Sequence, residues 1–322
     1  MGNSNRLQSQ SQMLLVKRII CYIVLTLLAF ISLFPFYLMI VNATRSHEQI
    51  QLGFSLVPGT SVWKNFINLA IDKTNYLDQV KAGKAVQGFW EKIIANQHYT
   101  KEINYAVNYP ILRGMVNSII IATLTAFLTT YFSSMTAYGI YMYKFKGRGF
   151  AFKFIMAVMM VPGQVSSLGF ISLLTKLGLM DKYVGLIVPA IAAPVVFFYM
   201  YQSMEATLPF SIVEAARVDG CNEFRTFNAI VIPMMKPALA VQAIFSFVGS
   251  WNNYFMPALV INTKKWWTVP IVIANARNAD YMQFDMAIIY MLLCFAVVPL
   301  IVVYLFLSKY IISGATAGGV KE

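Results

Sequence analysis

The stretch EAARVDGCNEFRTFNAIVIPMMKPAL, residues 214–239, carries the strongest local signal in this sequence. Ser211 stands just before it and can cap a helix, with Glu214 three residues later completing a capping box. Gly220 suits the left-handed conformation in which many helices end. A second helix is predicted by apolar residues spaced three and four apart, at Phe224, Phe227, Ile230 and Val231. We therefore expect two short helices joined by a sharp turn.

Two prolines, Pro233 and Pro237, follow this pair of helices and interrupt the helical pattern. The chain then enters a long apolar run. The result is a bent helix–turn–helix with acidic residues in its first turn and an apolar face. Taken alone, this pattern fits a docking element and a hairpin that merely links two membrane spans equally well.

The composition places the rest of the chain in a membrane. Of its 322 residues, 58% are hydrophobic and only 12% are charged, whereas an ordinary soluble domain has about 25% charged residues. The net charge of +12 comes from cations that flank apolar segments, so we expect no nucleic-acid partner. Three scattered cysteines, Cys21, Cys221 and Cys294, have no metal-binding or disulfide spacing. We expect an all-α membrane protein without metal or redox chemistry.

Six apolar runs are long enough for a transmembrane helix of roughly 20 residues: 19–41, 116–140, 154–175, 184–204, 237–262 and 286–308. They divide the chain into a short N-terminal segment (1–18), a first span, a long loop with short helices (42–115), a core of five spans (116–309) and a C-terminal tail (310–322). The core contains the segment 205–236, to which the predicted hairpin belongs.

Positive charge predicts the orientation of these spans. The long first loop is left aside, because the rule that relates charge to orientation applies to short loops. The N-terminus, two loops on the same side and the C-terminal end carry twelve cations: Arg6, Lys17, Arg18, Lys144, Lys146, Arg148, Lys153, Arg217, Arg225, Lys236, Lys309 and Lys321. The short loops on the other side carry fewer: Lys176, Lys182, Lys264, Lys265 and Arg277. By the positive-inside rule, both termini and the predicted hairpin face the cytoplasm.

The long loop between the first two spans contains the sequence GKAVQGFWEKIIANQ. Helical spacing of apolar residues predicts a short amphipathic helix there, with Val86, Phe89, Trp90, Ile93 and Ile94 on one face. Such a helix fits both a cap over the outer mouth and a docking surface for an external partner.

The predicted spans contain no Asp, Glu, Lys, Arg or His. Ionisable residues inside a membrane usually mark proton relays or voltage sensors, so their absence disfavours an ion-driven secondary carrier, which remains the alternative. The sequence has no GxxxxGK[ST] phosphate loop and no catalytic arrangement of side chains. We expect a non-enzymatic subunit that binds no cofactor itself and whose energy comes from another protein.

The segment 214–239 resembles the EAA loop of permeases in binding-protein-dependent ABC importers, with its E-A-A, D-G and two prolines. The stretches 117–148 and 159–189, WNNYFMPALV (251–260) and SGATAGGVKE (313–322) are similar to the MalG-like carbohydrate permeases. The long loop is not matched. Cys221 stands where the family usually has alanine, and Glu322 where a final glycine is common. The resemblance implies the fold of a type I importer permease with six transmembrane helices.

This resemblance implies that the hairpin lies in a cleft of the ATPase subunit. Carried onto this sequence, the contact is made by Glu214, Ala215, Ala216, Asp219, Gly220, Phe224, Phe227, Ile230 and Pro233. It also implies that the C-terminal tail reaches into the ATPase dimer through Thr316, Ala317, Gly318 and Gly319; a frayed terminus is the alternative.

On the outer side, the segment 263–284 corresponds to the family's loop that points towards the binding protein. Trp266 and Trp267 in this segment suit either an interfacial anchor or sugar stacking. Neutral side chains in or near the spans are candidates for a polar pathway: Asn117, Gln164, Trp251, Asn252 and Asn253. Interhelical hydrogen bonds are an equally plain role for them.

The resemblance thus implies a subunit of a bacterial cell-membrane importer for a sugar or oligosaccharide; glycerol phosphate is a possible substrate in the same family. Its partners would be a second, MalF-like permease, two copies of an ABC ATPase that hold ATP and magnesium, an extracytoplasmic solute-binding protein and membrane lipid.

Overall fold

The computed structural model describes residues 2–70, 111–279 and 284–319, and every regular element in these ranges is helical. The α-helices are α1 (Gly2–Ala43), α2 (His47–Gln51), α3 (Val62–Ala70), α6 (Ile111–Met142), α7 (Arg148–Met159), α8 (Gly163–Lys176), α9 (Val184–Ile187), α10 (Pro194–Thr207), α11 (Phe210–Val218), α12 (Glu223–Thr226), α13 (Ile232–Met234), α14 (Lys236–Trp251), α15 (Phe255–Val260), α16 (Val269–Arg277) and α17 (Met286–Gly319). Short 3₁₀ turns, η2 (Val188–Ile191) and η4 (Lys264–Trp266), and a π turn, η3 (Phe227–Val231), complete them.

Four segments are single helical stretches long and apolar enough to cross a membrane: Leu14–Ala43, Ile111–Met142, Val184–Thr207 and Met286–Phe306. Two further segments meet the same criteria only as bent pairs. Helices α7 and α8 meet at 98°, and Glu223–Met234 meets Lys236–Trp251 at 84°. If each bent pair is one span, the described chain has six. The prediction of an all-helical, multi-pass membrane protein is confirmed.

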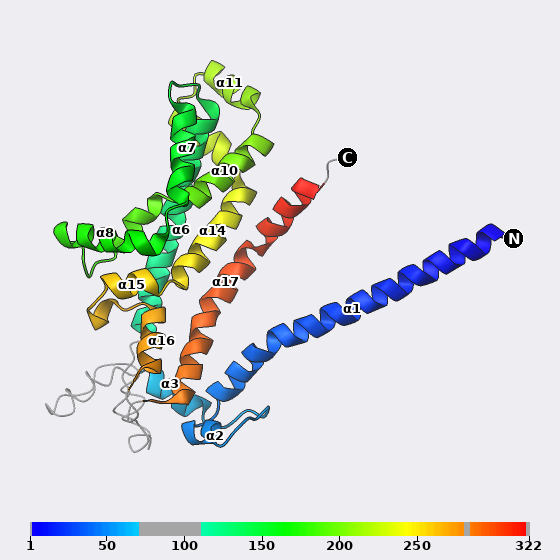
Figure 1. Ribbon diagram of the computed structural model, residues 1–322, viewed down its shortest axis with the longest axis vertical. Coiled ribbons are helices and arrows are strands. Elements are labelled where there is room, and N and C mark those ends of the chain that lie inside the picture. The colour runs from blue at the N-terminus through cyan, green and yellow to red at the C-terminus, as the bar shows by residue number, and fades with distance from the viewer. Residues whose placement is uncertain (1, 71–110, 280–283, 320–322) are drawn as a thin grey trace.

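The predicted spans differ from the structure where the chain bends or ends. The run 154–175 is broken because Pro162 lies in extended conformation before α8, which crosses α7 in Figure 1. The run 237–262 is divided between α14 and the short α15, with a turn at Asn252–Tyr254. Helix α17 continues past residue 308 to Gly319, so most of the predicted tail is helical.

The bundle is organised around α6, which packs along α14 and α10. At one end of the bundle, α6, α7 and α10 enclose an apolar cluster with residues that follow α10, including Phe227. At the other end, α6 shares a second cluster with α14, α16 and α17, with Trp251 at its centre. In Figure 1, α11 marks the first end, at the top, and α2, α3 and α16 mark the opposite end.

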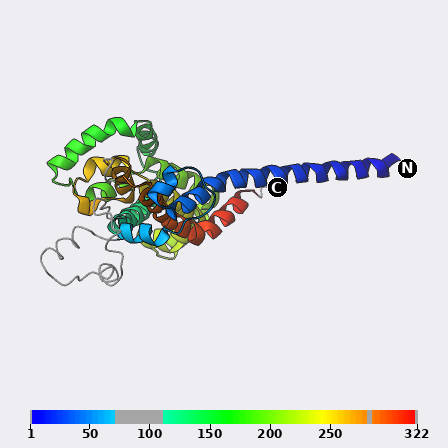
Figure 2. The same ribbon diagram turned by 90° about the horizontal axis from the view of Figure 1, so that it is seen from below.

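Helix α1 leans away from this bundle. It packs against α17 only near its C-terminal end, where Val41 is buried, whereas the residues from Leu14 to Tyr37 are exposed. Figures 1 and 2 show most of its length projecting from the other helices. Its outer side chains, such as Phe30 at 73% exposure, are apolar, as a lipid-facing helix requires.

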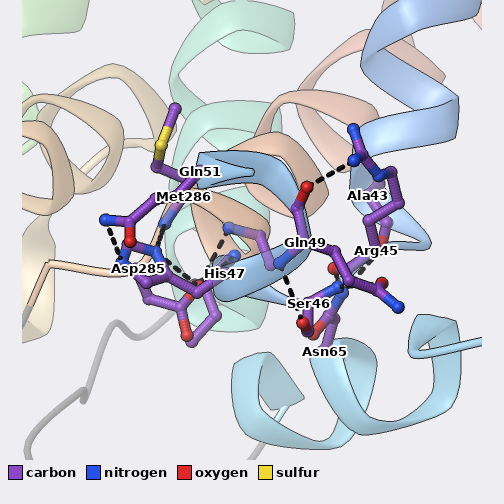
Figure 3. A network of polar contacts seen from close by, with 11 residues as sticks. Ala43, Arg45, Ser46, His47, Gln49, Gln51, Asn65, Asp285 and Met286 are labelled. Carbon is purple, nitrogen blue, oxygen red and sulfur yellow. Dashed lines mark hydrogen bonds and ion pairs between the residues drawn. The ribbon is translucent and has the colours of Figure 1, made fainter. Parts of the chain in front are cut away.

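The point from which α1 departs is held by a network of polar contacts (Figure 3). The guanidinium of Arg45, only 9% exposed, donates to Asn42 Oδ1 and to the carbonyls of Gln49 and Gly53. The Asn65 amide on α3 donates to the carbonyls of Ala43 and Arg45, both at 2.8 Å. These bonds satisfy the carbonyls that a helix end leaves without partners, and they tie α1 to α2 and α3.

The same network reaches the start of α17. Ser46 and Gln49 form a capping box for α2. One residue further on, His47 Nδ1 accepts a hydrogen bond from the Met286 backbone N–H at 3.1 Å and lies 4.0 Å from Asp285 Oδ1 (Figure 3). The first helix and the last are therefore joined through α2 at one end of the bundle.

A second polar latch connects the loop after α8 with the loop after α15. Asp181, at φ 59°, accepts hydrogen bonds from the backbone N–H groups of Asn262 and Thr263, both at 3.0 Å, and from the Thr263 hydroxyl. These hydrogen bonds, that of the Thr263 hydroxyl above all, lower the pKa of the Asp181 carboxyl, while slight burial opposes them. The carboxylate thus fixes two loops that are distant in sequence.

We expect Asp181→Ala to free this pair of loops, because alanine removes three hydrogen bonds and disfavours a positive φ. Faster hydrogen exchange at the amides of Asn262 and Thr263 would show it. Asp181→Asn is the matched control, since asparagine tolerates this backbone and keeps an acceptor oxygen. Because the folded pKa is lowered, the carboxylate's contribution is present above about pH 4 and is lost as the pH falls through that pKa. Equal exchange in the wild type and Asp181→Ala would contradict this role.

Candidate functional site

The predicted hairpin is present over residues 210–234. Helix α11 ends at Val218, and Gly220, two residues later, has a φ of +79°. The Cys221 N–H donates to the Ala216 carbonyl and the Gly220 N–H to the Arg217 carbonyl, which is the hydrogen-bond pattern of a Schellman ending. Helix α12 starts anew because the Asn222 side chain accepts from the Arg225 N–H at 2.8 Å. The turn at Gly220 is as predicted, and its bonding leaves the two helices little freedom relative to each other.

The predicted capping box at the start of α11 is not formed. The helix begins at Phe210 with Pro209 at the cap position, so Ser211 and Glu214 both lie inside it. Proline at this position sets the required extended conformation, and no side chain caps the helix. Glu214 is consequently exposed on the helix surface, and no described cation pairs with it.

A cluster of charged and aromatic side chains fixes the hairpin to α6. Arg217 Nε donates to Glu223 Oε1 at 2.7 Å, and the Tyr138 hydroxyl of α6 donates to Glu223 Oε2 at 2.8 Å. The Arg217 guanidinium also lies over the Tyr143 ring, 5.2 Å from its centre. Sequence reasoning missed this cluster, because Tyr138 and Tyr143 are far from Glu223 in the chain and only the fold brings them together.

The residues predicted to contact an ATPase fall on two different faces. Glu214, Ala215, Asp219, Gly220, Phe224 and Pro233 are exposed, with Phe224 at 66%. Ala216 and Phe227 are buried, and Ile230 is half-buried. Phe227 packs against Tyr131 and Tyr138 of α6, so its ring serves the chain's own core. The apolar surface that the hairpin does offer is completed by Val218, at 87% exposure, which the sequence reasoning did not select.

A cavity of about 480 Å³ lies between α6, η2, α10 and α14. Its polar lining consists of Ser118, Thr125 and Thr129 on α6, Gln242, Ser246 and Ser250 on α14, and Asn253 and Thr268 beyond them. No lining residue is ionisable. Of the predicted pathway residues, only Asn253 is among them. The other polar lining residues could have been found from the sequence by their spacing. Residues 242, 246 and 250 fall on one face of a helix, and so do residues 118, 125 and 129.

Two other predicted pathway residues hold helices together. The Asn117 amide donates to the carbonyls of Lys265 and Trp267, at 3.1 and 2.8 Å. The Trp251 indole N–H donates to the Ala296 carbonyl at 3.1 Å, and the ring is buried. These are the interhelical hydrogen bonds that the sequence left as an alternative. Gln164 and Asn252 are exposed outside the cavity.

Trp266 and Trp267 are half-buried against the chain itself. Trp266 meets Tyr183 edge-on at 4.9 Å, and Lys265 lies over its outer face. Trp267 packs on the cluster around Trp251. Their rings are therefore largely occupied by internal contacts.

Two predicted features are not tested by the described part of the chain and stay predictions. Thr316, Ala317, Gly318 and Gly319 form the last part of α17, but their side-chain surroundings lie outside the described part of the chain. The amphipathic helix with Val86, Phe89, Trp90, Ile93 and Ile94 also lies outside the described residues. In the described ranges, no group of three or more His, Cys, Asp or Glu residues could hold a metal ion.

Comparison with known proteins places these features in a family. Residues 129–315 match the model of the binding-protein-dependent transport system inner membrane component. The chain is 33% identical over 306 residues to the arabinooligosaccharides transport system permease protein AraQ of Bacillus subtilis, covering 95% of this chain and 96% of that protein. It is 28% identical over 308 residues to the trehalose/maltose transport system permease protein MalG of Thermococcus litoralis, covering 95% and 98%.

The fold has a solved counterpart. A chain in the crystal structure of a bacterial ABC transporter involved in the import of the acidic polysaccharide alginate matches with a TM-score of 0.68 and 17% identity, over 92% of this chain and 96% of that one. This likeness concerns the fold alone. Together, the family match over more than half of the sequence and the relative at 33% identity show that the chain belongs to the family of binding-protein-dependent transport system inner membrane components.

Proposed function

We propose that this chain is one permease subunit of an ATP-driven importer that moves a sugar or oligosaccharide delivered by an extracytoplasmic binding protein. The observation that carries the proposal is the likeness to AraQ along 95% of the chain. The charge-free, hydroxyl-lined cavity supports a neutral, hydroxyl-rich cargo over an anionic one such as glycerol phosphate, because a buried anion needs a compensating charge.

In this proposal the 210–234 hairpin is the contact with a separate ATPase. Its exposed face combines the carboxylate of Glu214, which has no ion-pair partner among the described residues, with the apolar side chains of Val218 and Phe224. A cation on the ATPase would pair with Glu214, and an apolar cleft would receive Phe224. Apolar surface of this kind usually marks a site of interaction. The excess of positive charge at this end supports a cytoplasmic location for the hairpin and for both termini.

The hairpin is suited to transmit a movement, because its two helices are joined by a bonded turn and fastened to α6 through Glu223 and Tyr138. When ATP draws two ATPase copies together, each copy shifts the hairpin seated in it as a rigid body. The spans then exchange an inward-open for an outward-open arrangement, with ATP favouring one of the two states. The second permease subunit would supply the other half of the pathway.

Purification of this chain from its native membrane tests the proposal. A second permease and two copies of an ATPase should accompany it. In liposomes, this complex with the cognate binding protein should accumulate arabinotriose or maltose only when ATP is supplied, and the chain alone should neither transport nor hydrolyse ATP. Accumulation driven by an ion gradient without any ATPase would favour a secondary carrier and refute the proposal.

A further inference from the structure

The side of α14 that faces the cavity carries polar groups without partners. Gln242 is only 7% exposed and lines the cavity, and its side-chain amide makes no hydrogen bond with any residue in the described ranges. Ser246 and Ser250, one and two turns later, line the same cavity and also lack a side-chain hydrogen bond to described residues. The Gln242 amide is not enclosed by protein atoms, and the two serines are half-buried, so this row faces the open space of the cavity and can bond to a molecule there.

Other hydroxyls on the long helices behave differently. Thr130 and Ser134 on α6 and Ser203 on α10 each donate to the carbonyl four residues earlier. This local bond is the usual solution for serine and threonine inside a helix. Ser246 and Ser250 do not adopt it, so their hydroxyls remain available to a molecule in the cavity.

The opposite wall has two threonines without partners, whereas Ser118 and Thr129 on the same side are hydrogen-bonded to the backbone of Val269 and Ala190. The hydroxyl oxygens of Thr125 and Thr268 are enclosed, and neither has a hydrogen-bond partner among the described residues. Both residues line the cavity, and Thr268 is 3% exposed. Burying such groups unpaired costs free energy, which is recovered if a bound molecule or a small shift on binding supplies the missing partners.

We propose that this cavity is a solute site contained within the single chain, and that it binds one unit of an uncharged, polyhydroxylated molecule. The inference rests on the proposed function and locates its cargo. Gln242 offers both a donor and an acceptor, Ser246 and Ser250 offer hydroxyls, and Phe245 offers an apolar face to the ring carbons. The enclosed hydroxyl of Thr268 joins them after a small shift on binding. The volume of about 480 Å³ lies in the range of small-molecule sites, which is about 300–1,000 Å³.

The walls also define what the site rejects. Its lining contains hydroxyls, amides and apolar groups but no cation. A carboxylate or phosphate entering it would lose its water without gaining a counter-charge. The site therefore selects neutral sugars over sugar acids of the same size.

The test uses the whole complex in liposomes with its binding protein, and compares Gln242→Leu and Thr268→Val with the wild type. Arabinotriose and maltose are the neutral probes, and trigalacturonate is the anionic one. At saturating sugar, each variant should slow uptake about threefold to tenfold, the effect of one lost hydrogen bond. ATP hydrolysis stimulated by the loaded binding protein should persist, and the melting temperature should be unchanged or higher, because an unpaired buried polar group has been removed.

Matched controls are Gln202→Leu on the exposed side of α10 and Thr136→Val on the exposed side of α6, neither of which lines the cavity. Both should transport as the wild type does. If the cavity variants transport normally, or if they lose uptake, hydrolysis and thermal stability together, the site is wrong while the importer function stands. If the wild type transports no neutral sugar, or prefers trigalacturonate, both the proposed cargo and the proposed site are refuted.

Discussion

Replacing Gly220 by valine is expected to abolish ATP-driven uptake while leaving the subunit in the membrane. The φ of +79° at this position suits glycine, whereas a β-branched side chain there is strongly disfavoured. The Schellman ending of α11 would be lost, and with it the fixed angle between α11 and α12. The ATPase should no longer co-purify, or should hydrolyse ATP without stimulation by the loaded binding protein.

The matched control for this variant is Gly147→Val. Gly147 also has a positive φ, +92°, and lies in a loop at the same end of the bundle, between α6 and α7. It imposes a similar backbone strain outside the hairpin, so uptake should fall far less. Glu214→Lys should reproduce the loss of association by reversing a charge on an exposed surface. Normal uptake by both Gly220→Val and Glu214→Lys would refute the role of the hairpin.

Phe227→Ala is expected to reduce the stability of the fold, whereas Phe224→Ala is expected to weaken binding to the ATPase. Phe227 is 2% exposed between two tyrosines of α6, so its truncation leaves a cavity, and such losses cost about 3–5 kcal/mol in well-packed cores. We expect little folded protein after detergent extraction. Phe224, at 66% exposure, contributes little to stability. Its truncation should leave a normal melting temperature but a weakened hold on the ATPase.

Fluorescence-detected size-exclusion chromatography measures the first effect, and co-purification of the ATPase measures the second. Tyr254→Ala, which removes an exposed aromatic ring after α14, is the control for a general loss of aromatic surface. If both phenylalanine variants remained folded and bound the ATPase equally, the division of the hairpin into an inner and an outer face would be incorrect.

Features that depend on the residue types of one short segment could be predicted from the sequence. The spans follow from apolar length, and the turn at Gly220 follows from a residue type that tolerates a positive φ. The exact helix ends could not be predicted, because Pro162 bends the chain between α7 and α8 and because α17 continues through polar and small residues. Prediction of the faces also failed at Phe227, since helical spacing identifies an apolar stripe without saying whether this chain or a partner covers it.

The lining of the cavity was harder to predict from the sequence, for a different reason. Asn117 and Trp251 are predicted pathway residues because amides and aromatic rings suit a sugar, yet their hydrogen bonds to Trp267 and Ala296 belong to helix packing. Gln242 is not among the predicted residues, although it begins a row of polar residues four apart on an apolar helix. A row of polar residues on a buried helix is therefore better evidence for a cavity than the chemical type of one residue. The regular spacing of such a row shows that its side chains share one face of the helix.

Helix α6 connects the two ends of this machinery. Tyr138, near one end, holds the hairpin through Glu223, while Ser118, Thr125 and Thr129, towards the other, form a wall of the cavity. At 1.5 Å per residue, its 32 residues make a rod about 48 Å long. If such a rod pivots at one tip, a tilt of about 5° displaces the opposite tip by about 4 Å. A rod of this length would let a small displacement of the hairpin change the width of the cavity towards the other end of α6.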